Sequence, residues 1–194
     1  MPSLRRVALC LTAVALLSVA VAPPAGAAVA NGGFEAPTAP VGGFQRLAAG
    51  SALGAWTVTA NDVDLSGVGF WQTAEGGQAL DLEGGSGFGA VSQSIATAPV
   101  RTAFRVRFAL AGNPLGGPAV KTLRVLVDGQ AVGDFSFDTT GRSPSDMGYA
   151  QREVSFTSTR LVTTLTFAST TGSGYGPVVD DVRVAPRCPG LVCP

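Results

Sequence analysis

The chain has 194 residues, with 13 Lys and Arg, 13 Asp and Glu, and no His. This balance excludes the basic surface of a nucleic-acid-binding domain, and a hydrophobic fraction of 46% with only 13% charged residues excludes a disordered chain. The absence of histidine excludes Ser-His and Cys-His catalysis. The length suits a single domain with a full core rather than two domains.

Residues 1–27 have the composition of a secretory signal peptide. Two arginines precede an apolar run over residues 7–22, and Ala25-Gly26-Ala27 matches a cleavage site of the A-x-A type. Ala28-Val29-Ala30 matches it too, and a membrane anchor is the alternative, which the following Pro-Pro pair disfavours. We expect a secreted, extracellular protein with no membrane span after removal of the signal. Loss of the two arginines leaves a net charge of 11 − 13 = −2.

Residues 28–185 carry the pattern of an all-β domain. Short segments rich in Val, Phe and Thr alternate apolar and polar positions, which is typical of half-buried antiparallel strands, and no segment keeps a helical period for three turns. Turns rich in Gly and Pro separate them, so the pattern predicts a β-sandwich or barrel. The main segments are 29–35, 54–58, 63–65, 79–84, 90–97, 104–110, 123–127, 134–138, 151–157, 161–169 and 178–185.

The clearest alternation runs from Phe104 to Gly129. Its first part alternates apolar residues with Arg105 and Arg107, and residues 113–118 then form a cluster of Asn, Pro and Gly that no strand can absorb. A second alternating part ends at Asp128-Gly129, a dipeptide typical of tight turns. We therefore predict a central hairpin of two strands around a long loop, followed by a tight turn.

Several short segments, in their order along the chain, resemble the choice-of-anchor C family, bacterial relatives of a domain of unknown function (DUF642) best known from plant cell-wall proteins. The resemblance implies a galactose-binding-like jelly roll, an all-β sandwich of two antiparallel sheets, in an extracellular setting and with polysaccharide binding. Members often carry Trp at Tyr149 and Asn at Asp181, and often end in a surface anchor. The segments are NGGFE (31–35), Gly54-x-Trp56, ALDLEG (79–84), LAGNPLGGPAVKTLRV (110–125), FDTTG (137–141) and YGPVVDDVRV (175–184).

A structural calcium ion is the first candidate site. Asp180 has the same parity as Val178 and Val182 in the last strand, so we expect its carboxylate to point inward, where it needs a partner. Related sandwich modules hold calcium between the first and last strands, which implies Glu35 and Asp180 as ligands, with oxygens around Asn31 completing the set. The alternative is that Asp180 caps backbone amides or pairs with an arginine.

Aromatic side chains in loops form the second candidate site, because flat apolar faces stack on sugars while polar groups fix the hydroxyls. Trp56 follows a Gly-x turn and leads into Thr57-Val58, so we predict that it belongs to the core. The alternative is that all the loop aromatics close the ends of the sandwich. The predicted ligand-binding residues are Trp71, Tyr149, Tyr175, Asn113, Lys121 and Asp138, with Arg142 nearby.

Two carboxylate pairs, Asp62/Asp64 and Asp81/Glu83, each occupy one face of a strand. A glycosidase needs such a pair across a cleft, but a solvated strand face explains the alternation equally well, and we predict no catalytic residue and no enzyme. The tail over residues 186–194 holds Cys188 and Cys193, which we expect to form a disulfide after export. With the surface anchor of the family replaced by this tail, we expect release into the medium.

The leading hypothesis is therefore a secreted, non-catalytic module that binds carbohydrate, such as a cell-wall polysaccharide. We expect a monomer with one structural Ca²⁺ and no other cofactor, and no nucleic acid among its partners. The alternative is an extracellular structural or protein-interaction domain without sugar affinity, with a cell-wall protein as its partner.

Overall fold

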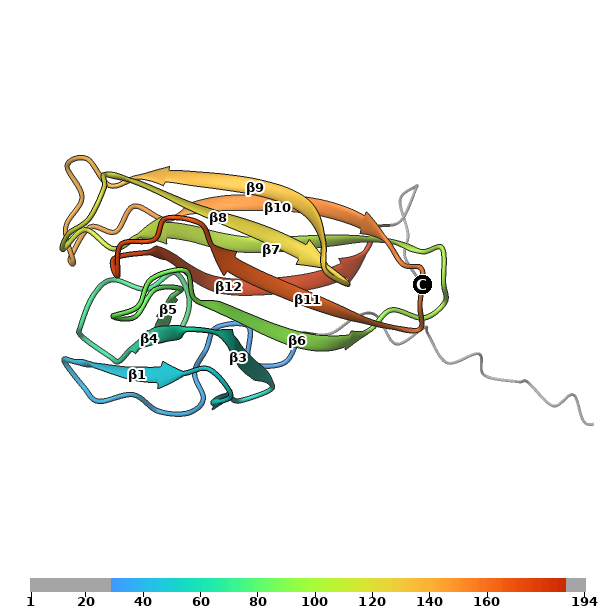
Figure 1. The fold of residues 1–194 in the computed structure, drawn as a ribbon, viewed down its shortest axis with the longest axis horizontal. Coiled ribbons are helices and arrows are strands. Elements are labelled where there is room, and N and C mark those ends of the chain that lie inside the picture. The colour runs from blue at the N-terminus through green and yellow to red at the C-terminus, as the bar shows by residue number, and fades with distance from the viewer. Residues whose placement is uncertain (1–28, 188–194) are drawn as a thin grey trace, which may run out of the picture.

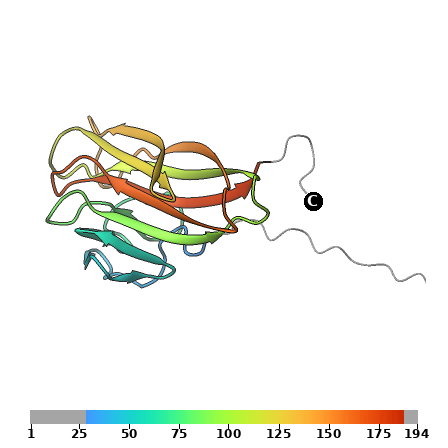
Figure 2. The same ribbon diagram turned by 45° about the vertical axis from the view of Figure 1, so that its right-hand side comes forward.

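The computed structural model describes residues 29–187. They form two sheets of six antiparallel strands each, which pack face to face (Figures 1 and 2). The strand order is β1-β4-β5-β12-β7-β10 in sheet A and β2-β3-β6-β11-β8-β9 in sheet B. The predicted two-sheet antiparallel β-sandwich is confirmed. The strands are β1 (Phe44–Ala48), β2 (Ala52–Leu53), β3 (Trp56–Ala60), β4 (Asp62–Ser66), β5 (Ala79–Asp81), β6 (Ala90–Ala96), β7 (Ala103–Gly112), β8 (Val120–Val127), β9 (Gln130–Asp138), β10 (Ala150–Thr157), β11 (Val162–Ser169) and β12 (Pro177–Pro186).

The signal peptide predicted over residues 1–27 and the disulfide predicted between Cys188 and Cys193 lie outside the described residues. Within residues 29–187, no helix is long and apolar enough to cross a membrane.

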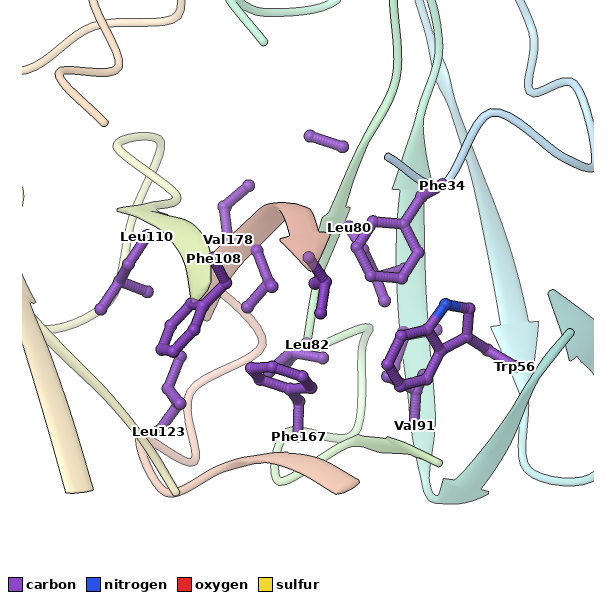
Figure 3. Packing of buried hydrophobic residues seen from close by; sticks show 14 of the residues in the cluster. Phe34, Trp56, Leu80, Leu82, Val91, Phe108, Leu110, Leu123, Phe167 and Val178 are labelled. Carbon is purple, nitrogen blue, oxygen red and sulfur yellow. The ribbon is translucent and has the colours of Figure 1, made fainter. Parts of the chain in front are cut away.

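Aromatic rings from both sheets meet in the core (Figure 3). Phe167 of β11 contacts Phe108 of β7 with 5.0 Å between ring centroids, and it contacts Trp56 of β3 at 6.0 Å. Trp56 is fully buried, and its indole nitrogen donates a hydrogen bond of 3.1 Å to the carbonyl of Asn31. The prediction that Trp56 belongs to the core is confirmed.

The predicted central hairpin is wrong in its pairing. Strand β7 pairs with β12 and β10 in sheet A, whereas β8 pairs with β11 and β9 in sheet B, so the loop after Gly112 crosses from one sheet to the other. Alternation identifies a strand but not its neighbour. The predicted tight turn is confirmed, since Asp128 and Gly129 have φ of 49° and 79° and join β8 to β9 as a hairpin.

The N-terminal segment also departs from the prediction. Residues 29–35 form no strand, because Asn31 and Phe34 take left-handed conformations with φ of 55° and 58°. The segment still lies against the last strand, where the amide of Val182 donates to the carbonyl of Gly32 at 2.9 Å. The first strand, β1, was missed because its sequence, FQRLA, has no β-branched residue.

A bulge in β12 overturns the predicted direction of Asp180. The register shifts between Asp180 and Arg183. Because of this shift, even-numbered residues before it and even-numbered residues after it point to opposite faces of the sheet. Asp180 lies opposite Ala109 on the outer face of sheet A, whereas Val184 lies opposite Val106 on the core face. Asp180 is nevertheless fully buried, since the loop before β5 covers it.

Candidate functional site

A cavity of about 470 Å³ opens beside the outer face of sheet A, near the end of the sandwich where β7 ends and β1 and β12 begin, on the left in Figure 1. Its volume falls in the range of small-ligand sites. We call it the aromatic cavity. It is lined by Phe44, Arg46, Asp64, Phe70, Trp71, Gly85, Asn113, Leu115, Ser173, Gly174 and Tyr175.

Four aromatic side chains contribute to this lining. Phe70 contacts Phe44 and Trp71, with ring centroids 5.5 Å and 4.9 Å apart. Trp71 is buried, whereas Phe44 is 46% exposed and Tyr175 41% exposed, so the last two offer ring surface to a ligand. A Cβ at Gly116 would lie 2.9 Å from the Tyr175 ring, so a glycine there lets the ring pack against the loop.

The polar groups of the cavity are held in place by hydrogen bonds. Arg46 on β1 lies opposite Asp64 on β4 and donates two hydrogen bonds of 2.9 Å to its carboxylate. The Asn113 side chain accepts from the amide of Leu115 at 3.0 Å and donates to Asp81 at 2.7 Å. The orientation of both groups is therefore set before any ligand arrives.

Two buried carboxylates beneath the cavity hold the loop that carries Tyr175. Glu83 accepts hydrogen bonds from the backbone amides of Gly172, Ser173 and Gly174, and Asp81 accepts one of 3.0 Å from the amide of Gly176. Both carboxylates are fully buried, so the prediction of a solvated strand face for this pair is wrong. The reason is that β5 lies inside sheet A, between β4 and β12, with loops covering its outer side.

The pKa values of these two carboxylates shift in opposite directions. Burial raises the pKa of Asp81 to about 8, against the hydrogen bonds that it accepts from the side chain of Asn113 and the backbone amide of Glu83. Burial also acts to raise the pKa of Glu83, but hydrogen bonds from Ser169, the 172–173 backbone and Phe88 outweigh it, and that pKa is lowered. Glu83 is therefore a charged anchor for the loop.

A family model described as "Protein of unknown function (DUF642)" matches residues 27–185. The chain belongs to the DUF642 family. The narrower resemblance to the choice-of-anchor C family stays a prediction. A comparison with curated proteins gives no match.

Solved carbohydrate-binding modules are similar to this DUF642 chain in structure. One is TmCBM61 in complex with β-1,4-galactotriose, with a TM-score of 0.51 and 17% identity over 82% of this chain and 97% of that one. Another is a family 35 module from Clostridium thermocellum, with a TM-score of 0.48 and 12% identity over 72% and 97% of the two chains. At such identities, the likeness to TmCBM61 shows a shared fold alone.

The structure brings three of the predicted ligand-binding residues of the DUF642 domain together, namely Trp71, Tyr175 and Asn113. Sequence reasoning missed Phe44, Phe70, Arg46 and Asp64 as partners in the same cavity. Phe70 directly precedes Trp71, which was a usable signal. Phe44 and Arg46 belong to β1, a strand that the sequence pattern did not indicate.

The other three predicted residues lie elsewhere. Lys121 is fully buried and donates to the carbonyl of Gly116 at 2.6 Å, and burial lowers its pKa despite the nearby Asp81 and Glu83 carboxylates. Asp138 is exposed and accepts hydrogen bonds from Thr140. Tyr149 packs against the core, and burial raises the pKa of its hydroxyl.

The predicted calcium ligands bind backbone amides. Asp180 accepts from Ala74 and Glu75 at 2.8 and 2.9 Å, and Glu35 accepts from residues 77 and 78 at 2.9 and 3.0 Å. The Asn31 side chain bonds the backbone of residues 36 and 53. Burial raises the pKa of Asp180 to about 7, against hydrogen bonds from the backbone. Between residues 29 and 187, no group of three or more His, Cys, Asp or Glu is arranged to hold a metal.

Proposed function

We propose that this DUF642 domain is a secreted, non-catalytic module that binds carbohydrate in the aromatic cavity. The observation that carries the proposal is the convergence of four aromatic side chains with Arg46, Asp64 and Asn113 around one opening. Exposed rings stack on the C–H faces of sugars, and fixed polar groups select hydroxyls. The fold shared with TmCBM61, a protein solved with β-1,4-galactotriose, supports this choice of ligand class.

The carboxylates near the cavity support binding rather than hydrolysis. A glycosidase needs two carboxyl groups facing each other across the sugar. Asp64 lines the cavity but is engaged by Arg46, while Asp81 and Glu83 lie buried and hold backbone. Among the described residues, Asp64 is thus the one carboxylate in the lining.

Depletion from solution tests this function. The purified protein is mixed with a panel of insoluble polysaccharides and cell walls, and its affinity for soluble β-1,4-galactotriose is measured by calorimetry. We expect selective retention that falls about tenfold in Tyr175→Ala and in Phe44→Ala, because loss of one stacked ring removes about 1–1.5 kcal/mol.

Leu161→Ala is the matched control, since Leu161 is 62% exposed, precedes β11 and does not line the cavity. This variant should bind like the original protein. If no member of the panel retains the protein, the sugar-binding proposal fails, and an extracellular protein-interaction domain without sugar affinity replaces it.

We further propose one structural calcium ion at Asp180 and Glu35. The carboxylate of Glu75, which the sequence did not single out, supports this site because Glu75 and Asp180 both approach Gly33. Glu35 would have to move toward them to complete a set of three carboxylates. Carboxylate and carbonyl oxygens are the ligands that calcium prefers. Calcium should raise the melting temperature and EDTA should lower it, with no response in Asp180→Asn. An unchanged melting temperature with EDTA excludes the ion.

Secretion is the remaining part of the proposed function. The signal-like composition of residues 1–27 supports it. Expression of the full chain in a secreting host should release protein whose first residue is at or just after Ala28. Retention of the intact N-terminus in the cell would exclude it.

A further inference from the structure

A second polar surface lies on the outer face of sheet A, toward the other end of its strands. On β7, Arg107 precedes Asn113 of the aromatic cavity by six positions, which corresponds to about 20 Å of extended strand. We call this surface the arginine face. Its basic members, four of the 13 Lys and Arg residues of the chain, are Arg105, Arg107, Arg183 and Arg187.

The register of the strands places like charges side by side. Arg107 on β7 lies directly opposite Arg183 on β12, and on its other side it lies opposite Glu153 on β10. Opposite residues of neighbouring strands share a face, and like charges in that position destabilise a sheet. Two acidic residues, Glu153 and Asp181, accompany the four arginines, so the arginine face has a surplus of positive charge.

The two acidic residues leave much of the guanidinium surface free. Glu153 meets the Nε atoms of Arg105 and Arg107 at 3.0 and 2.9 Å, and Asp181 meets the Nε of Arg183 at 2.7 Å. Within residues 29–187, the terminal nitrogens of Arg107 and Arg183 make no hydrogen bond, and the two side chains are 58% and 71% exposed.

Two other arginines of the sandwich provide a contrast. Arg46 uses both its Nε and a terminal nitrogen on Asp64, and Arg124 does the same on Asp134. Those guanidinium groups are already engaged in two-point contacts. Arg107 and Arg183 therefore retain the paired N–H donors that fit a carboxylate.

The shape of the surface suits an extended ligand. Two shallow depressions of about 460 and 340 Å³ lie on this face, and Arg107 and Arg183 line both. Among residues 29–187, no aromatic side chain lines either depression. A ligand here would be recognised by its charge rather than by stacking.

We infer that the arginine face binds the carboxylates of an acidic polysaccharide, a polymer of uronic acid. Several arginines in neighbouring positions fit a polymer that repeats its negative charge, and the planar guanidinium group suits carboxylates. The choice of a polysaccharide among polyanions rests on the proposed function. The aromatic cavity does not suit the same sugar, because the Asp64 carboxylate lines it and the Asp62 carboxylate lies nearby.

Affinity electrophoresis tests the inference, with polygalacturonate as the probe and its fully methyl-esterified form as the uncharged comparison. We expect the intact protein to be retarded by the acid form alone, and less so as salt rises. The double variant Arg107→Gln/Arg183→Gln should bind polygalacturonate at least tenfold more weakly, with an unchanged melting temperature.

Arg124→Gln is the matched control, because this exposed arginine pairs with Asp134 in sheet B and should leave polygalacturonate binding unchanged. Tyr175→Ala separates the two surfaces, since it should weaken retention on neutral glycans and leave polygalacturonate binding intact. If the aromatic cavity does not bind sugar, the intact protein will fail to bind neutral glycans but will still bind polygalacturonate.

Two results would overturn the inference. One is the absence of polygalacturonate binding, or binding that the double variant does not weaken. The other is equal, arginine-dependent binding of inorganic polyphosphate or of DNA, which would make the surface a general site for polyanions.

Discussion

Glu83 holds more of the candidate site in place than any residue that lines the cavity. Its carboxylate reaches three consecutive backbone amides of the loop before β12, the amide of Phe88 and the hydroxyl of Ser169. A backbone segment without regular structure needs partners for its N–H groups, and a buried carboxylate supplies several at once.

Replacement of Glu83 by Gln should therefore loosen the loop. In glutamine one carboxylate oxygen is replaced by an NH2 group, which donates and cannot accept, so the N–H groups that bond to that oxygen of Glu83 lose their partner in a buried place. We expect the free energy of unfolding to fall by about 2 kcal/mol or more in urea titrations, together with weaker retention on glycans. Glu153→Gln, on an exposed carboxylate, should cost less than about 1 kcal/mol. Equal losses in the two variants would contradict this role.

Trp56 is a residue of the core and not of the binding site. Its removal in Trp56→Ala leaves a large cavity between Phe34 and Phe167, so we expect the free energy of unfolding to fall by about 3–5 kcal/mol. Thr57→Ala, exposed on the same strand, should change it by less than about 0.5 kcal/mol. A neutral Trp56→Ala in chemical denaturation would show that the core prediction is wrong.

The burial of Asp81 and Glu83 marks the limit of prediction for single residues. Alternation with Leu80 and Leu82 indicates which face they share, but not what covers that face. The cover comes from residues 172–176 and 113–116, far away in the sequence. Trp71, Tyr175 and Asn113 were found because loop aromatics and amides have local signals of their own.

At the scale of elements, turns were easier to predict than strand partners. Asp128-Gly129 specifies its own geometry, because both residues take positive φ and the sequence offers a glycine for one of them. The sequence of the loop over residues 113–119 does not specify the path of the loop. The loop crosses from sheet A to sheet B because β7 and β8 pair with different neighbouring strands. The bulge after Asp180 likewise depends on the pairing of β12 and has no sequence marker.

Gly129 provides a direct test of turn geometry. Its φ is 79° and a Cβ there would meet no atom within 4 Å, so a substitution acts through the backbone conformation alone. We expect Gly129→Ala to lower the free energy of unfolding by about 1 kcal/mol and Gly129→Asn to lower it by less, because Asn tolerates left-handed conformations. Equal effects of the two substitutions in urea titrations would contradict this explanation.

At the scale of the whole molecule, the buried carboxylates make stability depend on pH. The pKa of Asp81 is raised to about 8 and that of Asp180 to about 7, from 3.8, so between about pH 4 and pH 8 the folded state binds more protons than the unfolded state. The stability that Asp81 and Asp180 contribute is complete at a pH below their pKa in the unfolded state. It is lost as pH rises through their pKa in the folded state. Glu83, with its lowered pKa, contributes in the opposite sense at acid pH.

In buffer that contains EDTA, where no cation holds Asp180 charged, we therefore expect the melting temperature to fall as pH rises from about 5 to about 8. Asp81→Asn should make this decline shallower, because the asparagine does not titrate. Differential scanning calorimetry at several pH values measures both slopes. A melting temperature that is constant or rises over this range would contradict the raised pKa values.

The outer side of sheet B has a different chemistry from that of sheet A. Thr59, Ser92 and Thr166 form a ladder of hydroxyls across β3, β6 and β11, with contacts of 3.2 and 2.8 Å. Because the aromatic cavity and the arginine face both belong to sheet A, a polymer held by either surface would leave the hydroxyl ladder facing outward. A fibre coated with this domain would then present a neutral, hydrated layer to its surroundings and mask the acidic groups beneath.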